Sequence, residues 1–230
     1  MVGKKCVTFI LMVLISSIAC GQQVDKNGFR GAGGSVAFGV GFMDFTSLNS
    51  DLKALDMPVF NKTQRSLDVG LTGGAFIKRF YLGGSGSLQL GASASDTHYE
   101  LKYTGGYGML KAGYTLIDRS PVIVYPTIGF GGGGQNLRIE PKNSPDGNLP
   151  TMDNNLHVGY MLIDFGINAD LISLDKDDGG QLVLGLSLGY KWKPWVGGWE
   201  FDGQHLQAFD KFYANGLYVK LNLGWGTFNF

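Results

Sequence analysis

Hydrophobic and polar residues alternate with a period of two along most of the chain beyond residue 30. The clearest example runs from Gln181 to Lys193, where leucines and aromatics occupy every second position and, from Gly185 onward, glycine, serine and lysine occupy the positions between them. This period places successive side chains on opposite faces of a β-strand. The pattern predicts strands with one apolar face and one small, polar face.

Seven further stretches show the same alternation: residues 35–45, 67–78, 81–95, 103–116, 122–135, 156–172 and 214–230. Several are about 11–17 residues long, whereas strands of globular sheets usually have about 5–6 and a tilted transmembrane strand needs about 9–11. The apolar faces carry almost no charge in their central parts. The eight stretches predict an all-β fold, an eight-stranded antiparallel up-and-down transmembrane β-barrel.

The connections between these stretches alternate in length. Long segments are expected at 46–65, 140–155 and 194–211, an intermediate one at 96–102, and short turns near residues 79–80, at 117–121 and at 175–180. Outer-membrane barrels have long external loops and short periplasmic turns. We therefore expect the three long segments on the external side, where they would carry any binding.

The N-terminus has the pattern of an export signal. Lys4 and Lys5 precede about fourteen uncharged residues, too few to span a bilayer as a helix but suited to a secretory signal peptide. We expect residues 1–21 to be the signal peptide, 22–30 a short periplasmic segment and 31–230 the barrel. Cys20 leaves lipidation open, because residues 17–20 resemble a bacterial lipobox with Ser17 where leucine is usual.

The composition and the motifs argue against several kinds of partner and site. Lys and Arg total 19 and Asp and Glu total 19, so no basic excess favours a nucleic-acid partner. The two cysteines, Cys6 and Cys20, leave the mature chain without a disulfide. Gly131–Gly134 is not a phosphate loop, because no lysine or helix follows; it predicts a bulge or a close backbone approach. No metal or cofactor motif is evident, so neither a metal nor a cofactor is expected.

The chain closes Phe228-Asn229-Phe230, and a terminal aromatic on an amphipathic strand resembles the assembly signal of outer-membrane barrels. The whole mature chain is similar to the small OmpX/OmpA transmembrane-domain type, with glycine-rich strands like those of many Bacteroidetes barrels. The resemblance implies an outer-membrane location, contact with outer-membrane lipids and the barrel-assembly machinery, and a monomer. Phe228 and Phe230 fall on the opposite phase from Leu217 and Trp225, so either the register slips near Gly226 or these aromatics point inward.

Charged residues on the polar faces are expected to form paired networks in the lumen, because eight strands enclose room for side chains only and an isolated buried charge is costly. These residues are Asp68, Lys78, Lys111, Asp164, Asp170, Lys191, Lys193 and Lys220. A second set near the strand ends is expected to anchor the barrel at the membrane interfaces. It comprises Tyr103, Tyr107, Tyr114, Tyr190, Trp192, Trp195, Trp199 and Trp225.

The function expected is that of a non-enzymatic barrel that serves envelope integrity, adhesion or contact with a ligand or host. A lipid-modifying enzyme is an alternative, because His98, His157 and His205 all fall toward the external side with acidic neighbours such as Glu200. A small-solute pore and a soluble lipocalin-like barrel with its apolar face inward are further alternatives. Alternation alone does not distinguish inside from outside.

Overall fold

The computed structural model describes residues 29–119, 121–142, 155–173, 180–201, 204–206 and 215–229. Within them, eight long strands pair in an antiparallel ring of order β1-β2-β3-β4-β6-β7-β8-β11, with β11 returning to β1. The strands are β1 (Phe29–Asp44), β2 (Thr63–Ile77), β3 (Phe80–Ser95), β4 (Tyr99–Tyr114), β6 (Val122–Pro141), β7 (Asn155–Ile172), β8 (Gln181–Trp192) and β11 (Gly216–Phe228). The predicted eight-stranded up-and-down barrel is confirmed.

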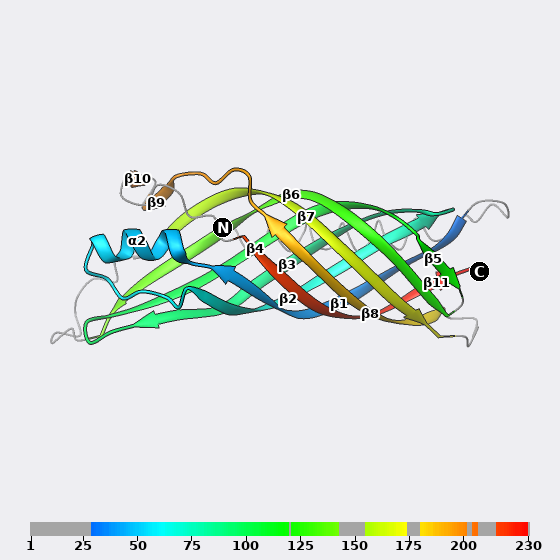
Figure 1. The fold of residues 1–230 in the computed structure, drawn as a ribbon, viewed down its shortest axis with the longest axis horizontal. Helices are drawn as coiled ribbons and strands as arrows, with labels where there is room; N and C mark the ends of the chain where they lie inside the picture. The colour runs from blue at the N-terminus through cyan, green and yellow to red at the C-terminus, as the bar shows by residue number, and fades with distance from the viewer. Residues whose placement is uncertain are drawn as a thin grey trace.

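The ring closes with a stagger. Paired residues followed around the barrel from Val158 on β7 pass through Gln135, Gly105, Gln89, Asp68, Gly39, Lys220 and Ser187 and return to β7 at Asn168. A closed barrel requires this shift together with strand tilt. Figure 1 shows the strands crossing the long axis diagonally. Closure leaves every strand paired on both sides where the eight strands form the ring, so the ring itself has no free edge.

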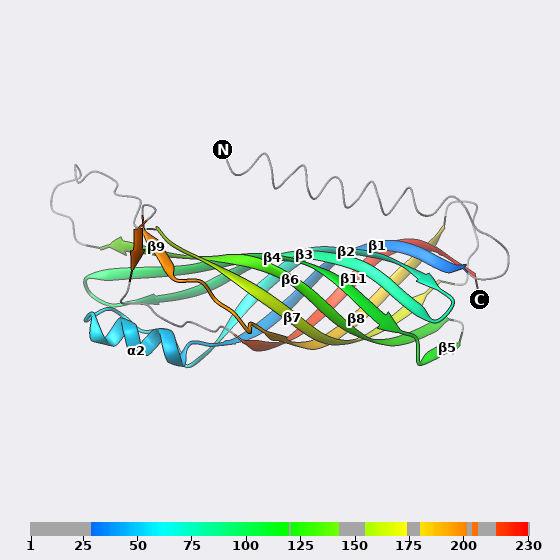
Figure 2. The same ribbon diagram turned by 90° about the horizontal axis from the view of Figure 1, so that it is seen from above.

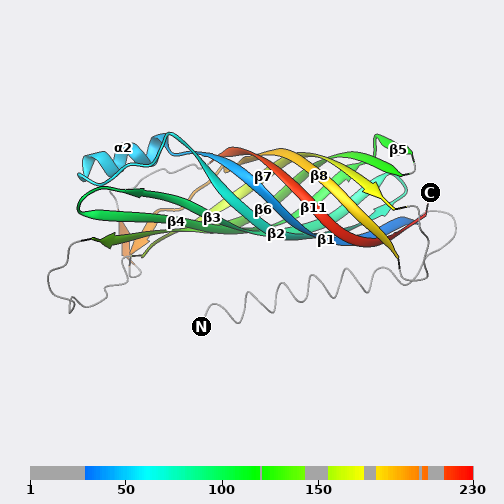
Figure 3. The same cartoon turned by 90° about the horizontal axis from the view of Figure 1, so that it is seen from below.

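The two ends of the barrel differ. The C-terminus and the short strand β5 (Ile117–Arg119) lie at one end, here called the terminus end (Figures 1 and 2). The other end, called the loop end, carries helix α2 (Thr46–Ala54), the β3–β4 turn and the short strands β9 (Trp199–Phe201) and β10 (Gln204–Leu206) (Figures 1 and 3). No helix among the described residues is long and apolar enough to cross a membrane.

The outer face of the barrel is apolar. On β8 every second side chain from Leu182 to Trp192 is exposed, and on β11 the same holds from Leu217 to Trp225. Leu110 on β4 is 77% exposed. Each stretch is close to the ~9–11 residues with which a tilted strand crosses a bilayer. The predicted outward direction of the apolar faces is therefore correct, as a transmembrane barrel requires and a soluble ligand-binding barrel does not.

This apolar band ends before four of the strands do. On β7 the outward positions change from Met161–Leu171, which are largely apolar, to Gly159 and His157. On β6 they change from exposed Ile128 and Phe130 to Asn136, Arg138 and Glu140. β3 and β4 also continue past the apolar band, where β3 pairs with β4 and β4 pairs with β6. The parts of β3, β4, β6 and β7 beyond the band, with α2 and β9, are called the loop-end extension below.

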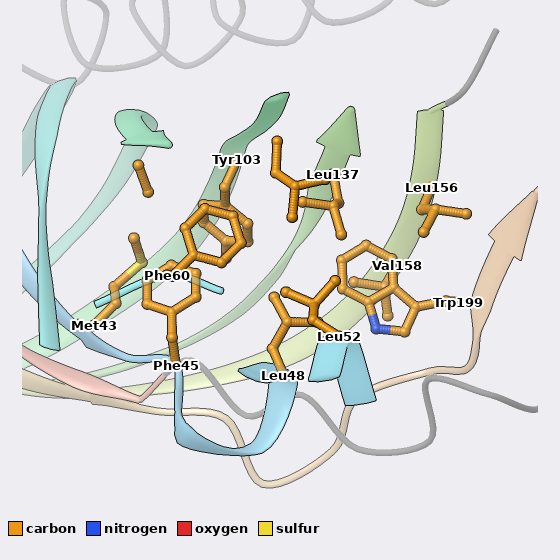
Figure 4. Packing of buried hydrophobic residues seen from close by; sticks show 12 residues of the cluster. Met43, Phe45, Leu48, Leu52, Phe60, Tyr103, Leu137, Leu156, Val158 and Trp199 are labelled. Atoms are coloured by element: carbon orange, nitrogen blue, oxygen red, sulfur yellow. The ribbon is translucent and has the colours of Figure 1, made fainter. Parts of the chain in front are cut away.

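The extension has an apolar core of its own (Figure 4). Twelve buried residues pack together inside it: Met43, Phe45, Leu48, Leu52, Phe60, Ala92, Leu101, Tyr103, Leu137, Leu156, Val158 and Trp199. Leu48 and Leu52 lie one helical turn apart on α2, so one face of the helix covers the inner side of the strands. Asn49 holds the segment that follows α2 in place. Its Oδ1 accepts the N–H of Phe60 at 2.9 Å, and its Nδ2 donates to the carbonyl of Phe60 at 2.7 Å.

The structure adds a helix in this region and corrects one expectation. Residues 46–65 were expected as a long connection, and α2 occupies the first part of it. The alternation over residues 81–95 puts Ala92 and Ala94 in phase with Leu82 and so predicts the lipid face for them, yet Ala92 is buried and Ala94 packs against the core of the extension. A bulge between Gln89 and Ala92 shifts the register, and Gly91 at φ 98° supplies the left-handed backbone it needs.

A second cluster closes the terminus end. It consists of Phe76, Tyr81, Ile123, Tyr125, Ile172, Val183 and Phe228. The pairing of β11 with β1 runs without interruption from Gly216 to Phe228, so no slip occurs near Gly226. Phe228 consequently points inward, and its backbone N–H donates to Gln181 Oε1 at 2.9 Å. Of the two alternatives that the sequence left open, the inward one holds for Phe228.

Candidate functional site

Asp68 on β2 is the centre of an ionic network that crosses the lumen. Its carboxylate accepts hydrogen bonds from Lys191 Nζ on β8 (2.5 Å), Lys220 Nζ on β11 (2.9 Å) and the hydroxyl of Tyr107 on β4 (3.0 Å). Lys220 also donates to Ser87 Oγ on β3 at 2.9 Å. These side chains come from five strands, so the network ties opposite walls of the barrel together.

Further polar groups fill the lumen toward the terminus end. Lys111 pairs with Asp164 at 3.0 Å, and the hydroxyl of Tyr125 donates to Asp170 at 2.8 Å. A cavity of about 70 Å³ lies among side chains that include Ser87, Asn168, Ser187, Asn222, Phe76 and Phe228. This volume holds a few water molecules rather than an aqueous channel. The aromatic cluster of the terminus end forms part of its wall.

The structure places most of the predicted lumen charges inside the barrel. Asp68, Asp164, Lys191, Lys193 and Lys220 are buried, and Lys111 and Asp170 are partly buried. Lys193 Nζ has no hydrogen-bond partner among the described residues and lies 4.2 Å from the ring centre of Tyr160. Lys78 is a correction: it is exposed in the β2–β3 turn at φ 57°, because β2 ends at Ile77.

The aromatic girdle is only partly as expected. Tyr114, Tyr190, Trp192, Trp195 and Trp225 are exposed on the outer side. Tyr103, Tyr107 and Trp199 are instead buried, Tyr107 in the lumen and the other two in the core of the extension. Alternation assigns a face to each aromatic residue but does not show whether that part of the strand borders lipid or a core.

The outer face of the extension is charged. Lys102 Nζ on β4 lies 2.8 Å from Glu140 on β6, and Arg138 Nε lies 2.8 Å from the same carboxylate. The hydrogen bond from Lys102 lowers the pKa of Glu140. In the β3–β4 turn, Asp96 accepts the N–H groups of His98 and Tyr99, both at 2.7 Å, which lowers the pKa of its carboxyl. These exposed pairs leave a hydrated, charge-bearing surface.

Of the three histidines considered for enzymatic chemistry, the structure describes the side chains of His98 and His157. His157 Nδ1 lies 2.5 Å from Asn136 Oδ1 rather than beside a nucleophile. Among the side chains that the structure describes, no group of three or more His, Cys, Asp and Glu lies close enough to hold a metal ion. The glycine run is a place of close approach, since a Cβ on Gly133 would lie 2.6 Å from the Tyr160 hydroxyl oxygen. No bulge occurs there, because β6 pairs continuously with β4 and β7.

Several sequence expectations fall outside the described residues. These are the signal peptide with Cys20, residues 22–28, most of 140–155, much of 202–214, most of the turn at 175–180, and Phe230. The assembly role expected of Phe228 and Phe230 is not tested by the position of Phe228.

Comparison with known proteins gives similarity of fold. No protein-family model and no curated protein matches the chain. The solved structures that resemble it include Neisserial surface protein A, at 11% identity and a TM-score of 0.48, with 86% of this chain and 97% of that chain covered. Ail, the attachment invasion locus protein of Yersinia pestis, is similar at 10% identity and 0.46 in a complex with the heparin analogue sucrose octasulfate, with 86% and 98% covered. At these identities no functional residue is transferred.

Proposed function

We propose that this chain is a non-enzymatic outer-membrane β-barrel that displays the loop-end extension at the cell surface for contact with a ligand, a host or another envelope component. Residues 1–21 act as its export signal, with Cys20 either removed or lipidated. The barrel is inserted as a monomer by the assembly machinery, which reads the terminal aromatics Phe228 and Phe230.

The observation that carries this proposal is the change of the outer surface along β6 and β7. The same two strands present apolar residues over the length that a bilayer needs and then continue with Asn136, Arg138 and His157 exposed. Strands that served only as an anchor would end with the apolar band. The strands that continue past the apolar band here pack against a core of twelve buried residues, so the extension presents a rigid surface.

The side chains that fill the lumen favour an anchoring role for the barrel over the transport of a solute. Asp68 binds side chains from three other strands, and apolar clusters pack inside both ends. A solute would have to break ion pairs in a low-dielectric interior and displace both clusters, whereas porins keep a water-filled channel in a wider barrel.

Single cysteines and a membrane-impermeant maleimide test the orientation in intact cells. Arg138→Cys places a thiol on the extension, and Lys78→Cys places one in a turn at the terminus end. We expect labelling of Cys at position 138 in intact cells and of Cys at position 78 only after the outer membrane is permeabilised. Labelling of position 78 alone would reverse the orientation, and labelling of neither in an outer-membrane fraction would remove the display role.

A further inference from the structure

Lys193 is a buried lysine that the ionic network of the lumen leaves unpaired. Its side chain is 2% exposed, and its Nζ has no hydrogen-bond partner among the described residues. The ammonium group lies over the ring of Tyr160, 4.2 Å from the ring centre. A ring face attracts the positive charge but offers the N–H donors no acceptor oxygen. An ammonium group in this position is costly in a low-dielectric interior unless an anion lies beside it.

The buried charges of the lumen do not balance. Among the side chains that the structure describes, three lysines and two aspartates are buried: Lys191, Lys193 and Lys220 against Asp68 and Asp164. Both carboxylates already hold other lysines, because Asp68 binds Lys191 and Lys220 and Asp164 binds Lys111. Lys193 is therefore the surplus cation of the described lumen.

Gln135 supplies neutral donors beside the same tyrosine. It is fully buried, and neither its Nε2 nor its Oε1 has a hydrogen-bond partner in the described part of the chain. Gly133 pairs with Tyr160 and Gln135 pairs with Val158, so Gln135 and Tyr160 are diagonal neighbours on the inward face. Diagonal positions are about 7–8 Å apart, within reach of long and aromatic side chains. Lys193 and Gln135 thus both lie beside Tyr160.

These side chains lie between the ionic network and the core of the extension. On β8, Lys191 is one inward position before Lys193 and belongs to the network. On β7, Val158 belongs to the core of the extension (Figure 4), and Tyr160 is the next inward residue toward the network. The unpartnered ammonium and amide groups therefore meet fixed charges on one side and apolar side chains on the other.

We propose that Lys193 and Gln135 bind a small monovalent anion of the chloride class inside the barrel. Ammonium and amide N–H groups are the donors that such an anion accepts, and one negative charge balances the surplus ammonium. A halide carries no further polar atoms that the neighbouring apolar side chains would leave unbonded. The site belongs to the folded chain alone, so it does not depend on the proposed cellular location or on the display role.

The first test is a crystal of the full mature barrel, folded in detergent and grown in sodium bromide. We expect an anomalous bromide peak within hydrogen-bond distance of Lys193 Nζ. The peak should be lost in Lys193→Met, which keeps an unbranched side chain without the charge. Lys53→Met removes an exposed lysine from α2 and is the matched control, with the peak retained. Density at Nζ without an anomalous signal would identify a water molecule and overturn the proposal.

The second test compares thermal unfolding in chloride with unfolding in gluconate, a much larger anion, at constant ionic strength. Because the anion binds only the folded barrel, chloride at about ten times its dissociation constant should raise the unfolding midpoint by about 3–6 °C. The rise should vanish in Lys193→Met and persist in Lys53→Met. In Gln135→Met, which removes one donor to a charged group, the chloride concentration needed for a given rise should increase at least about tenfold.

Two results of the second test would contradict the site: equal midpoints in chloride and gluconate, or a chloride effect that persists in Lys193→Met. Heat-modifiable migration on gels shows whether each variant is folded. If Lys193→Met does not fold, the crystal of the unmodified protein decides, and the absence of a bromide peak at Lys193 overturns the proposal.

Discussion

Replacing Asp68 by asparagine removes one negative charge from the centre of the lumen and changes the side-chain volume very little. The Lys191 and Lys220 ammonium groups lie 2.5 and 2.9 Å from this carboxylate. Two cations that share one carboxylate are about 6 Å apart, and at an effective dielectric constant of about 20 they repel by about 3 kcal/mol once the anion is gone. Breaking a buried ion pair from one side typically costs about 3–5 kcal/mol.

We therefore expect Asp68→Asn to lower the free energy of unfolding by about 3–5 kcal/mol. For a chain of this size that lowers the midpoint of thermal unfolding by roughly 6–20 °C. The midpoint is read from the temperature at which the folded band on a gel is lost. Asp96→Asn makes the same chemical change at an exposed carboxylate and serves as the control, with no comparable fall of the midpoint expected.

A second variant separates charge from packing. Removing one of the two repelling ammonium groups, in the double variant Asp68→Asn with Lys220→Met, should recover part of the stability lost in Asp68→Asn. The reasoning is refuted if Asp68→Asn unfolds at the same temperature as the unmodified protein, or if the double variant is no more stable than Asp68→Asn alone.

Three further predictions concern packing and protonation elsewhere. Leu52→Ala, at a fully buried site of α2, should make the extension sensitive to protease at a cost of about 2–5 kcal/mol, while Leu55→Ala, at an exposed site, should not; equal sensitivity contradicts the core. Gly133→Leu should prevent folding because a Cβ there would lie 2.2 Å from a carbonyl oxygen, whereas Gly134→Leu, with 3.7 Å, should give a heat-modifiable band. The lowered pKa of Asp96 means that its stabilising effect is complete above the usual value of 3.8 and is lost as pH falls through the lower folded pKa; a carboxyl NMR titration with a midpoint at or above 3.8 would contradict this.

The sequence allowed the barrel to be predicted because a period of two is a local property, and because the lipid selects apolar residues at every outward position. Leu182 to Trp192 shows this without interruption. The face predicted for a residue was wrong where a bulge changes the local backbone geometry. Gly91 introduces a bulge that turns Ala92 inward, and nothing in the alternation shows which glycine adopts a left-handed backbone.

Other features depend on contacts between distant segments. Helix α2 has only Leu48 and Leu52 to indicate its period, and their burial comes from strands that lie far along the chain. Trp199 was expected at the membrane interface because the alternation along the chain did not predict the short strand β9, on which it lies. The pairing of His157 with Glu200 depends on inter-strand register, which no spacing along the chain reveals.

The central claim is that the outward face of β7 contacts lipid while its inward face does not. Single cysteines from position 161 to 167, carrying a fluorophore, are compared in vesicles whose lipids bear a quencher. We predict strong quenching at 161, 163, 165 and 167, where the side chains are Met161, Ile163, Phe165 and Ile167, and weak quenching at the inward positions between them. Quenching of the opposite set, or none, would contradict a transmembrane barrel.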